Sequence, residues 1–97
     1  MKFYTFHQNN SGGSFIKNDK LDEFVVIEAN DYKHANERAT EIGLYFSGVR
    51  AGIDCDCCGD RWAEQYDEDG TESPEIYGET VDASGEKENT KIHYLGA

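Results

Sequence analysis

The sequence has few of the residues from which stable cores and covalent frameworks are built. Leu, Ile, Val and Phe together make up 18 of 97 residues, close to the level below which a highly charged chain is expected to be disordered. All three cysteines lie within residues 55–58, so no distant thiol can close a long disulfide loop. Twelve aromatic residues compensate, because each ring buries about 150–250 Å². We therefore expect one folded domain, residues 1–97, that is built without disulfides.

Long apolar runs are also missing. The longest aliphatic stretch is Phe24–Ile27, far shorter than the roughly 20 residues of a membrane-spanning helix. Residues Met1–Gln8 alternate and become polar at once, unlike a secretion signal. Clustered free thiols are typical of a reducing compartment. These features predict a cytosolic protein without a membrane partner.

Basic residues are scarce in the second half of the chain. Residues 1–50 carry seven acidic and six basic side chains, whereas residues 51–97 carry thirteen acidic and three basic ones, a net charge of −10. This charge repels nucleic acid and anionic lipid and attracts a basic protein surface. We predict no direct nucleic-acid binding, and a protein partner that contacts Asp67, Glu68, Asp69, Glu72 and Glu75. In the alternative interpretation these carboxylates only keep the surface solvated.

The hydrophobic pattern predicts an α+β fold. Residues 2–8 alternate like a strand, and Glu23–Ala29 reads as a buried strand. Apolar residues then recur at helical spacing up to Ile42, with Asn30 or Asp31 as the cap and Gly43 as the stop. We predict a four- to five-stranded, mainly antiparallel sheet with one helix, about residues 31–42, packed on a face.

The remaining strands of this sheet are shorter. Candidates are residues 15–16, which return from a turn at 9–14, and residues 61–65, 75–78 and 91–95. Residues 79–90 contain one aliphatic side chain, Val81. We therefore predict that 79–90 is a mobile segment.

Cys55 and Cys58 form a C-x-x-C step followed by Gly59, which is half of a typical zinc site. The other two ligands would come from histidines or from a second copy across a homodimer axis; the histidines are His7, His34 and His93. A turn or packing role without a cofactor is the alternative. Neighbouring aspartates disfavour thiolate chemistry. Because no acid, base and nucleophile occur at recognisable spacing, we predict that the protein is not an enzyme.

Three stretches carry a family resemblance: Phe3–Phe6 with Gln8–Phe15, Glu41–Phe46, and Asp54–Trp62. They resemble a group of small tailed-phage proteins of unassigned function. The resemblance implies a phage or prophage origin, and it supplies no catalytic residue. Small phage proteins of this kind often bind and disable a host enzyme or defence system.

Together these observations predict a non-enzymatic phage protein that acts in the host cytoplasm. It would bind and inhibit a host protein, for example one that processes nucleic acid or takes part in defence, through its acidic surface. One alternative is a module that sequesters a small ligand or nucleotide near residues 9–14, Arg50 and Arg61. The other is a structural zinc-binding domain at Cys55 and Cys58.

Overall fold

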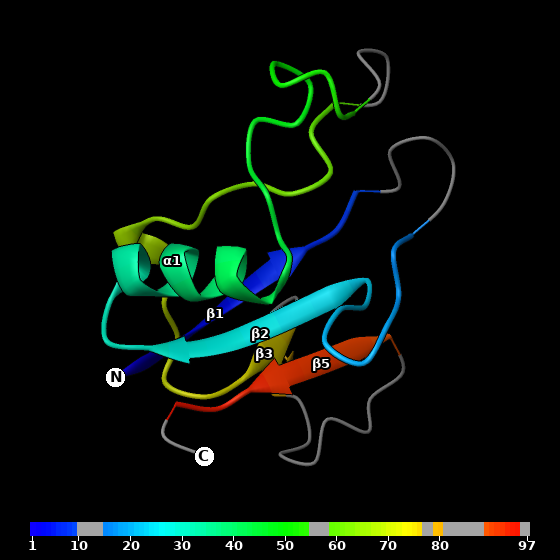
Figure 1. Ribbon diagram of the computed structural model, residues 1–97. Coiled ribbons are helices and arrows are strands. Elements are labelled where there is room, and N and C mark those ends of the chain that lie inside the picture. The colour runs from blue at the N-terminus through cyan, green and yellow to red at the C-terminus, as the bar shows by residue number, and fades with distance from the viewer. Residues whose placement is uncertain (10–14, 55–58, 77–78, 81–88, 96–97) are drawn as a thin grey trace.

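The computed structural model describes residues 1–9, 15–54, 59–76, 79–80 and 89–95. The elements follow in the order β1 (Lys2–His7), β2 (Phe24–Ala29), α1 (Tyr32–Ile42), the 3-10 helix η2 (Asp67–Asp69), β3 (Glu75–Ile76), β4 (Glu79–Thr80) and β5 (Thr90–His93). Helix α1 packs across one face of the sheet that contains β1, β2 and β5 (Figure 1). The fold is therefore α+β with one α-helix among the described residues, as predicted.

The sheet differs from the prediction in size and direction. Its strand order is β1-β2-β5, with β1 antiparallel to β2 and β5 parallel to β2. Strands β3 and β4 form a separate antiparallel pair. The described residues thus form a three-stranded mixed sheet, and the predicted four- to five-stranded, mainly antiparallel sheet is not seen.

Side-chain amides replace two of the strands that the sequence predicts. Gln8, which is fully buried, accepts a hydrogen bond from Ile16 N (2.6 Å) and donates one to Ile16 O (3.1 Å). Asn36 on α1 binds Gln65 in the same way. A carboxamide offers a carbonyl acceptor and N–H donors, so it can pair with a backbone segment as the peptide groups of a neighbouring strand do. The segments around Ile16 and Gln65 are therefore held to the core without joining the sheet.

Helix α1 agrees with the predicted bounds. The Asp31 side chain caps its first turn by accepting from His34 N (2.8 Å), and Gly43 ends it in the left-handed region at φ 118°. Ala35 and Ala39 are fully buried, and their small side chains let the helix lie close to β2. Around this contact the core contains Tyr4, Phe6, Leu21, Val25, Ile27, Ala29, Leu44 and Trp62.

The segment predicted to be mobile, residues 79–90, is described only in part. Glu79–Thr80 forms β4, and Thr90 begins β5. Residues 81–88 lie outside the described residues, so the predicted mobility stays a prediction.

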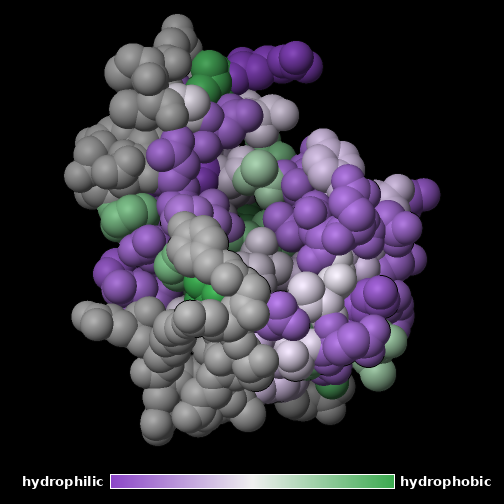
Figure 2. Space-filling view, turned by 180° about the vertical axis from the view of Figure 1, so that it is seen from behind, coloured by the Kyte–Doolittle hydropathy of each residue, from purple (hydrophilic) through white to green (hydrophobic). Residues whose placement is uncertain are grey.

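The surface of the described residues is mainly polar. On the face opposite to Figure 1, hydrophobic side chains form small, separate areas between hydrophilic ones (Figure 2). The large exposed hydrophobic residues are Met1, Ile16, Ile53 and Tyr66. Within the described part of the chain, no helix has the length and apolar character needed to cross a membrane.

Candidate functional site

Three carboxylates are presented on one short turn, Tyr66–Gly70, which we call the acidic turn. Its central residues Asp67, Glu68 and Asp69 form η2 and are all exposed. The Asp69 carboxylate accepts from Tyr66 N (2.7 Å), and Asp69 N donates to Tyr66 O (3.0 Å). Tyr66 itself is 58% exposed. The turn is closed by its own hydrogen bonds, one of them to the Asp69 carboxylate, and its three acidic residues remain exposed.

Both ends of the acidic turn are fixed to the body of the fold. On one side Asn36 Nδ2 donates to Gln65 O (3.0 Å), and Gln65 N donates to Asn36 Oδ1 (2.9 Å). On the other side Thr71 and Phe3 of β1 exchange two backbone hydrogen bonds of 2.8 and 2.9 Å. The turn is therefore placed by contacts that are distant in the sequence, to α1 at one end and to β1 at the other.

Tyr4 of β1 lies beneath the turn. A Cβ atom built on Gly70 would be 3.0 Å from both Cζ and the hydroxyl oxygen of Tyr4. The residue is 2% exposed, and its hydroxyl makes no hydrogen bond to any described residue. Burial raises the pKa of Tyr4, and the negative charges of Asp67, Asp31 and Asp69 raise it further. The negative field at this site therefore includes Asp31, from the first half of the chain.

The carboxylates of the predicted partner surface have no ionic partners among the described residues. The ion pairs found there are His7–Glu23, Lys17–Asp22 and Arg61–Asp54. Asp67, Glu68 and Asp69 are gathered on the acidic turn. Glu72 is exposed just after Thr71, and half-buried Glu75 lies in β3. Three of the five predicted residues thus form one cluster, and the other two continue along the chain beyond it.

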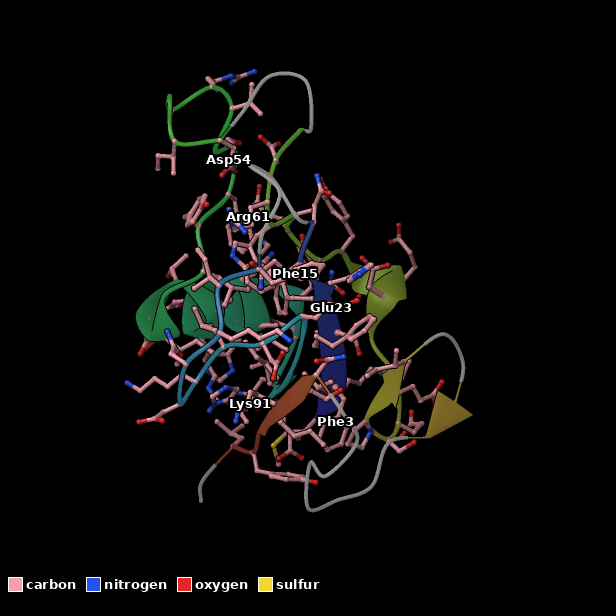
Figure 3. The ribbon with its side chains drawn as sticks, turned by 90° about the vertical axis from the view of Figure 1, so that its right-hand side faces the viewer. Phe3, Phe15, Glu23, Asp54, Arg61 and Lys91 are labelled. Carbon is pink, nitrogen blue, oxygen red and sulfur yellow. The ribbon has the colours of Figure 1, made fainter. Side chains whose placement is uncertain are left out.

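A second polar network lies at the base of the cysteine segment. Tyr45 Oη donates to Asp54 Oδ1 (2.7 Å), and Arg61 N donates to Asp54 Oδ2 (2.8 Å). The Arg61 side chain also donates to Tyr45 Oη and, through Nη1, to Gln8 Oε1 (2.8 Å). Figure 3 shows Asp54 and Arg61 between the loop and the level of α1. This network joins the two ends of the segment 54–61.

The network is internal rather than a binding site. The Asp54 side chain is 2% exposed and that of Arg61 is 11% exposed. Burial raises the pKa of Tyr45, the hydrogen bond to Asp54 raises it further, and Arg61 opposes the rise. Arg61, which the nucleotide hypothesis requires, is therefore engaged inside the fold, whereas Arg50 is exposed. No pocket is found among the described residues.

The predicted zinc ligands Cys55 and Cys58 lie outside the described residues. The histidines all have contacts elsewhere: His34 Nδ1 accepts from Asn30 N (3.1 Å), His93 Nε2 lies 2.8 Å from Lys20 O, and His7 stacks on Phe24 at 4.5 Å. In the described part of the chain, no three His, Cys, Asp or Glu side chains are grouped to hold a metal ion.

Tyr4 and Asn36 are the site residues that the sequence analysis missed. Tyr4 alternates with Phe6 on the buried face of β1, and a tyrosine at a core position brings a hydroxyl that needs a partner. Asn36 follows the buried Ala35 in α1. A short polar side chain in a helix is a weak signal, because its partner Gln65 is 29 residues away.

Comparison with known proteins places the chain in a family. A family model, described as a domain of unknown function (DUF7296), matches residues 1–96. The chain belongs to the DUF7296 family. No curated protein and no solved structure matches it. Because the DUF7296 description assigns no function, a functional proposal for this member depends on the geometry of its own residues.

Proposed function

We propose that the chain is a non-enzymatic phage protein that binds a host protein in the host cytoplasm and inhibits it by covering a basic surface. The observation that supports this most is the acidic turn. Its three carboxylates are exposed, have no ion pair among the described residues, and are carried by a segment fixed at both ends. The phage origin rests on the sequence resemblance.

Fixed placement matters for the affinity of such a surface. A flexible acidic segment loses conformational freedom when it binds, and this loss weakens the complex. The contacts of Asn36 with Gln65 and of Phe3 with Thr71 order the turn before binding. Complementary charge also speeds encounter with a basic partner. The exposed ring of Tyr66 adds contact area next to the charges.

Proteins that process nucleic acid have the kind of surface that an acidic protein would cover. They carry basic surfaces that bind phosphates, and the net charge of this chain is −11. An acidic protein seated on such a surface excludes the nucleic acid by occupying its site. We therefore propose a defence or nucleic-acid-processing protein as the target.

The experiment compares three tagged proteins expressed in host cells: the wild type, a turn variant and a control variant. The turn variant carries Asp67→Asn, Glu68→Gln and Asp69→Asn. The control carries Asp19→Asn, Glu37→Gln and Glu41→Gln, three exposed positions that are not part of the turn, so that both variants lose the same charge. A host protein that is captured and inhibited by the wild type and the control, but not by the turn variant, supports the proposal. Equal capture and inhibition by all three would refute it.

Zinc binding by Cys55 and Cys58 is a second candidate function, favoured by the closed base of their segment. Arg61 N donates to Asp54 Oδ2, which brings together the two ends of the segment that contains the cysteines. A C-x-x-C step in a zinc-binding protein supplies two of the four zinc ligands. The test is the metal content of protein purified without chelator, beside Cys55→Ser and Cys58→Ser. Absence of zinc from the wild type would exclude this function.

A further inference from the structure

The Tyr4 side chain is nearly enclosed by the fold, and its hydroxyl faces Gly70 of the acidic turn. The side chain is 2% exposed, and its oxygen makes no hydrogen bond to the described residues. The oxygen itself is not fully enclosed, because Nε1 of Trp62 is the one enclosed side-chain N or O atom without a partner among the described residues. Gly70 lies directly against this hydroxyl, and a Cβ there would approach the oxygen to 3.0 Å. A larger residue at position 70 would cover the hydroxyl from the side of the turn.

The charges around this hydroxyl make it a site for a cationic donor. Carboxylates of Asp67 and Asp69 from the turn, and of Asp31 from the cap of α1, lie close enough for their charges to act on Tyr4. Such a field attracts a cation, and a tyrosine hydroxyl can accept a hydrogen bond from a cationic donor. Lys2 packs against Gly70, where a Cβ would lie 2.9 Å from its Cδ, but it forms no ion pair with the described residues.

We propose that the Tyr4 hydroxyl and the Asp67 carboxylate together bind the guanidinium group of an arginine side chain of the partner. This inference rests on the proposed function and names the group that the acidic turn recognises. A guanidinium carries five donors in a planar fork, so it can bond a hydroxyl and a carboxylate at once. Its plane also stacks on an aromatic ring, and the exposed ring of Tyr66 is adjacent to Asp67. The lysine ammonium has no such plane.

The experiment titrates isotope-labelled protein with two short peptides at low ionic strength, monitored by backbone amide chemical shifts. The peptides are acetyl-Gly-Gly-Arg-Gly-Gly-amide and the same peptide with Lys in place of Arg, which have equal charge. We expect the arginine peptide to shift the amides of residues 66–70 and to bind about threefold or more tightly than the lysine peptide. Tyr4→Phe should weaken the arginine peptide about threefold to tenfold. This variant removes an oxygen without a partner among the described residues, so the fold should persist.

Three results would overturn the inference: equal affinity for the two peptides, unchanged arginine binding in Tyr4→Phe, or shifts located away from the acidic turn. Asp19→Asn with Glu37→Gln and Glu41→Gln should bind the arginine peptide as the wild type does. The two proposals fail separately. If the turn variant no longer captures the host protein, while the arginine and lysine peptides bind the wild type with equal affinity, only the arginine site is refuted. If arginine selectivity holds but that variant still binds and inhibits the host protein, only the proposed function is refuted.

Discussion

Asn36 and Gln65 form a paired contact in which a side-chain carboxamide takes the place of a neighbouring strand. The Asn36 amide donates to Gln65 O over 3.0 Å and accepts from Gln65 N over 2.9 Å. This contact connects α1 to the residue that precedes the acidic turn. The position of the three exposed carboxylates relative to Tyr4 therefore depends on a side chain of the helix, and not on the sheet alone.

Asn36→Ala should therefore weaken both the fold and the binding function. Two hydrogen bonds are lost, each worth about 0.5–1.5 kcal/mol, so we expect a decrease of about 1–3 kcal/mol in the free energy of unfolding measured with urea. The affinity for the partner should fall as well, because the turn is no longer held. Glu37→Ala, at the adjacent exposed position, serves as the control. Equal stability of the two variants would show that the Asn36 contact does not hold the turn.

Gly48 should tolerate no side chain, because the buried carboxylate of Asp54 lies against it. A Cβ at Gly48 would be 1.9 Å from Asp54 Oδ2 and 2.8 Å from a ring carbon of Tyr45. Gly48→Ala should lower the free energy of unfolding by about 3 kcal/mol or more, since it displaces a buried charged group.

Gly52→Ala is the matched comparison for this loop. Gly52 has φ +78° and no atom within 4 Å of a built Cβ. Gly52→Ala should therefore lower the free energy of unfolding by about 1 kcal/mol, and this loss comes from the backbone conformation alone. Urea unfolding of both variants gives the difference. A smaller loss for Gly48→Ala than for Gly52→Ala would mean that Asp54 is not packed in this way.

Stability should decrease at alkaline pH, in part through Tyr4. Its pKa in the folded state is raised above the ordinary tyrosine value of 10.0, first by burial and then by Asp67, Asp31 and Asp69. The folded state thus holds this proton more tightly than the unfolded state. The contribution of the protonated Tyr4 hydroxyl to the free energy of unfolding is complete below about pH 10, and it is lost as the pH rises through the folded-state pKa of Tyr4.

Tyr4→Phe should therefore make the free energy of unfolding, measured with a chemical denaturant, fall less steeply with pH in the alkaline range. Asp67→Asn should flatten this pH dependence less, because it removes one of the charges that raise the Tyr4 pKa. The Tyr45 pKa, which is also raised, leaves a residual slope in both variants. A profile of Tyr4→Phe as steep as that of the wild type would contradict this assignment.

Local pattern was enough to predict part of the fold. The cap Asp31, the spacing of Ala35 and Ala39, and the stop at Gly43 define α1 in the sequence, and the structure confirms its bounds. Strands β1 and β2 follow from alternation and from a continuous apolar run.

The rest depends on contacts between residues that are far apart in the chain. The parallel pairing of β5 with β2 joins Phe24 to Thr90, and no local pattern sets the direction of a strand. Gln8 is fully buried, and its side-chain amide bonds the backbone of Ile16 in place of a neighbouring strand. A polar residue such as glutamine gives no sign in the sequence that it will be buried. Likewise, the hydroxyl of Tyr4 becomes part of the site only when Gly70 is brought against it.

We propose that the acidic turn binds a basic partner through charge. The most direct measurement is the dissociation constant of the captured host protein at several salt concentrations, up to and beyond about 0.15 M. Wild type is compared with Asp67→Asn, Glu68→Gln and Asp69→Asn, and with Asp19→Asn, Glu37→Gln and Glu41→Gln. We predict affinity that falls steeply with salt for the wild type and the second variant, and weak binding with a shallow salt dependence for the first. Binding by the wild type that is independent of salt, or equal loss in both variants, would contradict the claim.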